Sequence, residues 1–377
     1  MGLALLASLA SGCTFYTACP DQQPPPVNNG GTNSGGGANG GGSSGNGGSG
    51  QPLIPWVNVT SNLSGMDSAC GNLTMVVPKE DMLIVGVAPR SLFTSVDGGE
   101  SWQEIAQGDG TDPIDGTPAA ITLDPDHPNT WWLSAIYGDH GIWRTDDNGD
   151  TFHVFTGPRH NDIVSVDFTD PDRNFMIAGG HESAQVVWRS FDAGETWEQI
   201  GDSFPSGAKD SSNPYVIDAD RVLMGTAGIS KGDSGIFLSA DSADSWDRVT
   251  TGEGGVGQPL VTSTGVYYWA SESGSVVKSE DEGETWEEVL PANSVSGTRS
   301  LVELPDGRLA TLTQYEGIKV SDDNFETRVQ VTEPTPFYTP GFSYSATEKA
   351  FFVWHNDCGD KVLDDAVMRA NFDFEVD

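Results

Sequence analysis

Six segments of this 377-residue chain repeat one short pattern, and this repetition constrains the fold more than any other feature of the sequence. The pattern is Ser or Thr, any residue, Asp, any residue, usually Gly, any residue, then Thr or Ser, followed in five copies by Trp or Phe. The Asp residues of the six copies are Asp97, Asp147, Asp192, Asp241, Asp281 and Asp323. They recur about every 45 residues, the length of one four-stranded propeller blade. We therefore expect an all-β ring of such blades.

The copies also resemble a known motif. The segment Ser190-Phe-Asp192-Ala-Gly194-Glu-Thr196-Trp197 is similar to the Asp box, or BNR repeat, of sialidases, sortilin-type receptors, xyloglucan-cleaving glycoside hydrolases and photosystem assembly factors. Five copies fit well, and the sixth, at residues 321–327, is degraded. The resemblance covers residues 53–377. It implies that each box joins the third and fourth strands of a blade, on the face opposite the usual ligand site, so the six aspartates are expected to be structural.

The chain has room for seven blades. Residues 53–377 correspond to about seven repeats of 45 residues. After the sixth box, residues 341–344, 349–354 and 367–372 indicate three more strands, and residues 56–60 supply one spare strand at the other end. Three strands plus one close the ring, which hides the open sheet edges.

The N-terminal 52 residues are expected to direct export and to link the domain flexibly to a membrane anchor. Residues 1–13 form a short apolar run with small residues before Cys13, and Leu9-Ala-Ser-Gly-Cys13 resembles the lipobox of bacterial lipoproteins, which implies lipidation of Cys13. No Lys or Arg precedes this run, so a plain signal peptide is the alternative. Residues 14–52, rich in Pro, Gly, Ser and Asn, are expected to be a flexible linker. We expect an exported, membrane-anchored lipoprotein, either periplasmic or on the cell surface.

The charge is strongly acidic. The formal net charge is −37, from 55 Asp and Glu against 18 Lys and Arg. A field of this sign repels phosphate backbones, so nucleic acid is not an expected partner. An acidic shell that keeps an exported monomer soluble is the simplest interpretation.

Two of the four cysteines fall where the ring closes. Cys70 lies in the connection that enters blade one, and Cys358 lies in a long loop of blade seven. Both loops are expected on the same face, so an oxidising compartment favours a Cys70–Cys358 disulfide. Two buried free thiols are the alternative, and Cys19 is left unpaired in the linker.

The loops opposite the Asp boxes carry the candidate functional residues. Candidates for acid–base or carboxylate catalysis are Asp139, His140 and Glu182. Candidates for ligand binding are Tyr137, Arg159, His160, His181, Trp354 and His355. Polar loop residues with no chemical role are the competing interpretation.

Metal binding has weaker support. Asp109, Asp112 and Asp115 are spaced three apart in the connection after blade one, and such carboxylates suit calcium. The spacing does not match an EF-hand, and solvated turn residues are the alternative. We expect no other cofactor.

The sequence says less about the function of this protein than about its fold. The three clustered arginines that mark sialidases have no match here, and one propeller cannot assemble the two-propeller cleft of xyloglucan hydrolases. We therefore expect a surface module that binds a glycan or protein at its loop face. The alternatives are a glycoside hydrolase that uses loop-face carboxylates, and a scaffold for envelope assembly.

Overall fold

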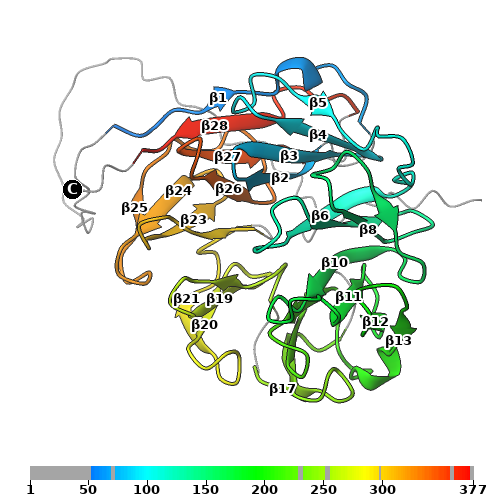
Figure 1. The fold of residues 1–377 in the computed structure, drawn as a ribbon. Coiled ribbons are helices and arrows are strands. Elements are labelled where there is room, and N and C mark those ends of the chain that lie inside the picture. The colour runs from blue at the N-terminus through cyan, green and yellow to red at the C-terminus, as the bar shows by residue number, and fades with distance from the viewer. Residues whose placement is uncertain are drawn as a thin grey trace, which may run out of the picture.

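The computed structural model describes residues 52–68, 73–227, 232–250, 255–296, 299–356 and 361–373. Over these ranges the chain forms a β-propeller of seven four-stranded antiparallel sheets (Figure 1). Two single-turn 3-10 helices, η1 (Ser61–Leu63) and η2 (Gly201–Ser203), accompany the strands. No helix in these ranges is long and apolar enough to cross a membrane. The predicted fold class is confirmed.

The blades follow one another in chain order, and each runs from an inner to an outer strand. Blade one contains β2 (Leu73–Lys79), β3 (Met82–Val87), β4 (Ser91–Ser95) and β5 (Gln103–Glu104). Blade two contains β6 (Thr117–Leu123), β7 (Trp131–Ile136), β8 (Ile142–Thr145) and β9 (His153–Val154). Blade three contains β10 (Asn161–Val166), β11 (Met176–Gly180), β12 (Val187–Ser190) and β13 (Glu198–Gln199). Blade four contains β14 (Asn213–Val216), β15 (Val222–Thr226), β16 (Gly235–Ser239) and β17 (Asp247–Arg248).

The remaining blades have the same form. Blade five contains β18 (Leu260–Val261), β19 (Tyr267–Ala270), β20 (Val276–Ser279) and β21 (Glu287–Leu290). Blade six contains β22 (Leu301–Glu303), β23 (Leu309–Thr313), β24 (Gly317–Ser321) and β25 (Val329–Gln330). Blade seven contains β26 (Phe342–Ser345), β27 (Ala350–Trp354) and β28 (Val367–Asn371), and its fourth strand is β1 (Val57–Asn58) from the N-terminal end of the domain.

Closure of the ring occurs as the sequence predicts. Strand β1 pairs antiparallel with β28, with Val57 opposite Arg369 (Figure 1). The main chain extends this pairing, because the Val59 amide donates to the Val367 carbonyl at 2.9 Å. The segment before β1 also contacts blade six, where the Ile54 amide donates to the Val331 carbonyl at 2.9 Å. Segments from both ends of the domain therefore close the ring at blade seven.

The core lies between blades. All six residues of β7 and all five of β11 are buried, because each sheet packs against a neighbour on both faces. Between blades one and two, Met75 and Ile84 pack with Trp131, Leu133 and Trp143. Burial on both faces explains why these strands are continuously apolar where a half-exposed strand would alternate.

Each Asp box is closed by its own side chains. In the third box, Asp192 Oδ1 accepts from the Ser190 hydroxyl at 2.8 Å and from the Thr196 amide at 2.8 Å, and Oδ2 accepts from the Thr196 hydroxyl at 2.6 Å. Gly194 has φ of 91° and lies against the Phe155 ring, so a Cβ there would be 2.8 Å from that ring. The box thus ties a strand end to the start of the next strand.

The sixth box has the same geometry although its sequence is degraded. Asp323 accepts from the hydroxyls of Ser321 and Thr327 at 2.8 and 2.6 Å and from the Thr327 amide at 2.8 Å. Phe325 takes the left-handed position that Gly holds elsewhere, with φ of 73°, and its ring is buried. The Ser, Asp and Thr residues therefore define the turn.

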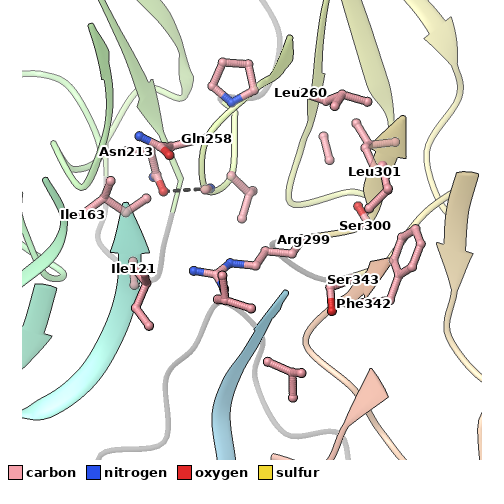
Figure 2. Close-up of a pocket in the computed structure, with 18 of the residues that line it drawn as sticks. Ile121, Ile163, Asn213, Gln258, Leu260, Arg299, Ser300, Leu301, Phe342 and Ser343 are labelled. Carbon is pink, nitrogen blue, oxygen red and sulfur yellow. Dashed lines mark hydrogen bonds between the residues drawn. The ribbon is translucent and has the colours of Figure 1, made fainter. Parts of the chain in front are cut away.

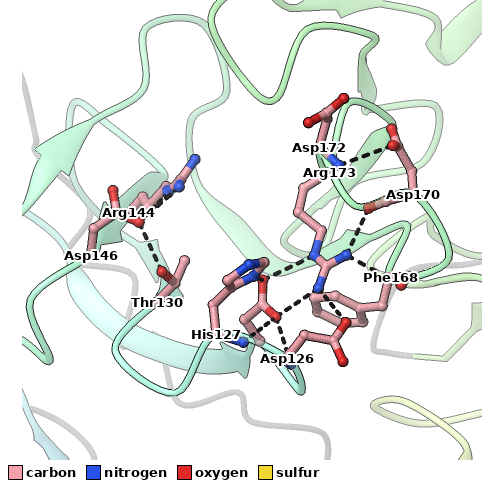
Figure 3. Close-up of polar contacts among 10 residues, drawn as sticks. Asp126, His127, Thr130, Arg144, Asp146, Phe168, Asp170, Asp172 and Arg173 are labelled. Atoms are coloured by element: carbon pink, nitrogen blue, oxygen red, sulfur yellow. Dashed lines mark hydrogen bonds and ion pairs between the residues drawn. The ribbon is translucent and has the colours of Figure 1, made fainter.

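A buried ion pair joins the turns of blades two and three on the Asp-box face (Figure 3). The guanidinium of Arg173, whose side chain is 5% exposed, donates to both carboxylate oxygens of Asp124 at 2.8 and 3.0 Å. It also donates to Asp126 and to the carbonyls of Phe168 and Asp170. Burial acts against ionisation of Asp124, but the hydrogen bonds from Arg173 outweigh it and hold the pKa of this carboxyl well below its usual range. No sequence pattern predicted this pair.

Candidate functional site

The centre of the ring contains a cavity of about 400 Å³ (Figure 2). Residues at or beside the innermost strands of all seven blades line it. Its apolar wall includes Val76, Ile121, Ile163, Leu260, Leu301 and Phe342. Its polar lining includes Asp162, Asn213, Gln258, Arg299, Ser300 and Ser343. In blades four to seven the lining residues precede or begin the inner strand, whereas in blades one and two Val76 and Ile121 lie at or past its middle, so the cavity runs along the channel from the side opposite the Asp boxes.

A chain of polar contacts leads from the cavity wall to the surface. Asp162 lines the cavity, and its Oδ1 lies 2.8 Å from His181 Nδ1. Nε2 of His181 lies 3.1 Å from the Tyr137 hydroxyl and 3.6 Å from Glu182 Oε1. Tyr137 is 53% exposed, so its ring is accessible from outside. His160 completes this group, which we call the tyrosine–histidine cluster.

The pKa values of the two histidines in the cluster are shifted in opposite directions. His160 Nδ1 accepts from the Tyr137 amide at 2.9 Å, so that nitrogen carries no proton. Burial and the nearby charge of His181 lower the pKa of His160. Burial also acts to lower the pKa of His181, but its hydrogen bond to Asp162 prevails and raises it. The hydrogen bond from Asp162 therefore favours protonation of His181 over that of His160.

A second acid, Asp210, lies near Asp162. The Asp210 side chain is fully buried in the connection between β13 and β14. Its Oδ1 accepts from Ser212 and from the Ala227 amide, at 3.2 Å for both the hydroxyl and that amide. Its Oδ2 has no hydrogen-bond partner among the described residues, and neither does Asp162 Oδ2. Burial first, and then the charge of Asp162, raise the pKa of Asp210 to about 7.

Four of the predicted residues, Tyr137, His160, His181 and Glu182, lie together in this cluster. The structure places the others apart from it. His140 pairs instead with Asp115, with 2.7 Å between Nδ1 and Oδ2. Asp139 and Arg159 are exposed in the neighbouring loops.

The predicted role of Trp354 as an exposed binding residue is wrong. Its side chain is 1% exposed and packs in the core between blades seven and one. The reason is that all five residues of β27, including Trp354 at its end, are buried by packing within the propeller. His355 is half-buried, with its ring 4.9 Å from that of Phe337.

The calcium candidates have other partners. Asp112 pairs with His153 at 3.3 Å and accepts from the Val154 amide, and Asp115 pairs with His140. Asp109 is exposed. In the described part of the chain, no group of three or more acidic, His or Cys side chains is arranged to hold a metal.

Sequence reasoning missed Asp162, Asp210 and Arg299. Two of them carry a recognisable signal: Asp162 lies at the start of the inner strand β10, and Arg299 lies just before the inner strand β22. A charged residue at the channel end of an otherwise apolar inner strand is unusual, and this feature identifies the lining of a propeller channel.

The fold and the central cavity define the class of this protein, a seven-bladed β-propeller with a cavity at the centre of its ring. Protein-family models give no match. The chain is 26% identical over 163 residues to the oligoxyloglucan-reducing end-specific xyloglucanase of Emericella nidulans, a match that covers 38% of this chain and 19% of that protein.

Two solved structures of similar fold are also β-propellers. YCF48 bound to D1 peptide superposes with a TM-score of 0.55 and 14% identity over 86% of this chain and 99% of its own. The GH74 xyloglucanase of Xanthomonas campestris gives 0.54 and 15% identity over 84% of this chain and 55% of its own. At these identities the likeness shows the fold.

Proposed function

We propose that this protein is an exported, lipid-anchored carbohydrate-binding propeller that takes its glycan at the tyrosine–histidine cluster. The observation that carries this proposal is the Tyr137 ring, which is 53% exposed and held from two sides. His181 Nε2 fixes its hydroxyl at 3.1 Å, and His160 Nδ1 fixes its amide at 2.9 Å. A rigid aromatic face with a polar end is suited to the apolar face and hydroxyl groups of a sugar, at little entropic cost.

The comparisons support a glycan more than another ligand class. The sequence match and one of the two structural matches are with enzymes that act on xyloglucan. A peptide ligand is the competing possibility, because YCF48 was solved with a peptide bound. We also propose that residues 53–377 form a single Asp-box propeller, because all six boxes share one hydrogen-bonding scheme.

Binding without cleavage is favoured by the state of the carboxylates. Hydrolysis of a glycosidic bond normally uses two opposed carboxyl groups, roughly 5–10 Å apart, on either side of the bond. Here Asp162 and Glu182 both contact His181, and Asp139 is exposed on a separate loop. Burial raises the pKa of Asp210 to about 7, but this side chain is fully buried and cannot reach a glycosidic bond.

The test is a screen of the full chain, carrying Cys13→Ser to keep it soluble, on a panel of polysaccharides and oligosaccharides. Binding and release of reducing sugar are measured together. We expect binding without release, and loss of binding in Tyr137→Ala. Phe191 provides the matched control, because it is also 53% exposed but lies in the third Asp box on the opposite face. Sugar release abolished by Glu182→Ala or Asp139→Ala would establish a hydrolase instead.

We propose the lipid anchor at Cys13 separately. Residues 1–51, which include Cys13, lie outside the described residues. Metabolic labelling with a fatty acid tests lipidation, and Cys13→Ala is expected to abolish the label. A labelled Cys13→Ala protein would contradict the anchor.

A further inference from the structure

Arg299 places an isolated positive charge in the central cavity. Its backbone is fixed beside blade seven, because its carbonyl accepts from the Phe342 amide at 2.9 Å and Arg299 bridges to Gly341. The side chain points away from this anchor into the cavity, which it lines (Figure 2). It remains partly accessible because it borders this space.

The Arg299 guanidinium makes no hydrogen bond or ion pair with any described residue, whereas other buried arginines in the same chain are paired. Arg173 binds two aspartates and two carbonyls, and Arg189 binds Glu198 and Asp244. Burial alone lowers the pKa of Arg299 to about 10, with no contribution from an acid, so the group stays a cation at neutral pH. Of the described arginines that are not exposed, Arg299 is the one without a hydrogen bond or ion pair to a described residue.

Two further donors at the cavity lack partners. The buried hydroxyls of Ser300 and Ser343 make no hydrogen bond within the described ranges, and both residues line the cavity with Arg299. Unpaired buried polar groups are costly, and an uncompensated charge is costlier still. An anion bound to Arg299 would compensate its charge, whereas Ser300 and Ser343 lie on the side of the cavity away from the guanidinium (Figure 2).

The chemistry of the cavity selects a single carboxylate. The planar fork of a guanidinium matches a carboxylate in two parallel hydrogen bonds. Asp162 shares the cavity and the net charge is −37, so an anion of higher charge, or an evenly charged polymer, would be repelled. The apolar side chains of Ile121, Leu260 and Phe342 complete the wall and strengthen the ion pair by excluding water.

We propose that Arg299 binds the carboxylate of a uronic acid residue carried by a mostly neutral glycan. This inference rests on the proposed function, because the tyrosine–histidine cluster, linked to the same cavity by Asp162, would bind the neutral part of that glycan. The cavity of about 400 Å³ falls within the roughly 300–1,000 Å³ range of small-ligand sites.

The experiment compares two ligands that differ in one group. The first is a xylo-oligosaccharide bearing one glucuronic acid, and the second is the same molecule with its carboxyl reduced to an alcohol. Calorimetry with the full chain is expected to show tighter binding of the acid. Arg299→Gln is expected to reduce affinity for the acid by about 10- to 100-fold and to leave the reduced form unaffected. The matched control is Arg90→Gln, which removes an exposed arginine between β3 and β4 and should change neither affinity.

A second readout separates binding from folding. Because Arg299 is uncompensated without a ligand, Arg299→Gln is expected to melt at the same temperature as the wild type or higher. A lower melting temperature would assign Arg299 to the structure and overturn the proposal.

The remaining outcomes are also decisive. Equal binding of both oligosaccharides, unaffected by Arg299→Gln, overturns the uronate site but leaves the glycan proposal standing. Binding of neither contradicts both. Arg299-dependent binding of a peptide with a free C-terminal carboxylate, but not of its amide or of the uronate, would assign the cavity to a peptide.

Discussion

Asp210→Asn is expected to stabilise this protein at alkaline pH and to leave it nearly unchanged in acid. Asp210 is fully buried, and its Oδ1 accepts hydrogen bonds from Ser212 and Ala227. An Asn keeps that acceptor and the same shape, but it cannot ionise. The substitution therefore removes only the cost of a buried charge.

The size of the effect follows from the pKa. The pKa of Asp210 is about 7 in the folded protein, against an ordinary 3.8. The folded state thus binds the proton more tightly, and stability falls as pH rises from about 3.8 to about 7. Above that interval the full cost is about 4 kcal/mol. For a domain of this length, with an unfolding entropy of about 0.7 kcal/mol/K, this corresponds to about 6 °C in melting temperature.

Differential scanning calorimetry at pH 4, 5.5, 7 and 8.5 measures the difference between the variant and the wild type. We expect almost no difference at pH 4, about 3 °C at pH 5.5, and about 6 °C at pH 8.5. Asp139→Asn, which replaces an exposed acid on the same face, is the control and should show no such trend. An offset that is constant with pH, or a variant less stable at pH 8.5, would refute the reasoning.

Two further predictions concern stability, and a third concerns the cysteines. Arg173→Met should lower the free energy of unfolding in urea by about 3–5 kcal/mol, since Asp124 would stay buried with hydrogen bonds from the Asp126 and His127 amides but without the guanidinium that balances its charge. Arg144→Met, which breaks an exposed pair with Asp146, should cost less than about 1 kcal/mol, and equal losses would refute the argument. Asp192→Ala and Asp323→Ala should each cost about 1–3 kcal/mol in the same assay, and a silent Asp323→Ala would show that the sixth box is not structural. We also propose the Cys70–Cys358 disulfide. Both residues lie outside the described ranges, but flanking segments pair, with the Ser68 amide donating to the Lys361 carbonyl at 2.8 Å. Alkylation of the denatured chain should label both cysteines only after reduction, and labelling before reduction would exclude the bridge.

The repeat made the fold predictable. An interval of about 45 residues gives the blade length, and the aspartates of the boxes mark where third strands end. Strand β1 was predictable for a different reason, because three strands after the sixth box leave blade seven one strand short. Periodicity and the need to cover sheet edges are properties of the chain as a whole, so a sequence expresses them directly.

The site was predictable only in part. Knowing which loops share a face brought Tyr137, His160, His181 and Glu182 together. It did not show that Trp354 turns into a blade interface, because side-chain direction at a strand end depends on packing against the next blade. The partner of His140 also depended on the path of the loop that carries Asp115. Both contacts join segments whose relative position no local pattern encodes.

The two faces of the propeller differ in how their charged side chains are paired, and this difference supports the proposed binding site. In the Asp boxes, the carboxylates of Asp192 and Asp323 accept hydrogen bonds at both oxygens. At the cavity, by contrast, Asp162 and Asp210 each keep one oxygen without a partner in the described structure, and the Arg299 guanidinium has no partner among the described residues. Such groups cost free energy, which the apolar packing between blades must offset. Local departures from full pairing are expected where a protein binds a ligand, because the ligand supplies the missing partners. At the central cavity, in contrast to the Asp-box face, variants should therefore change binding more than stability.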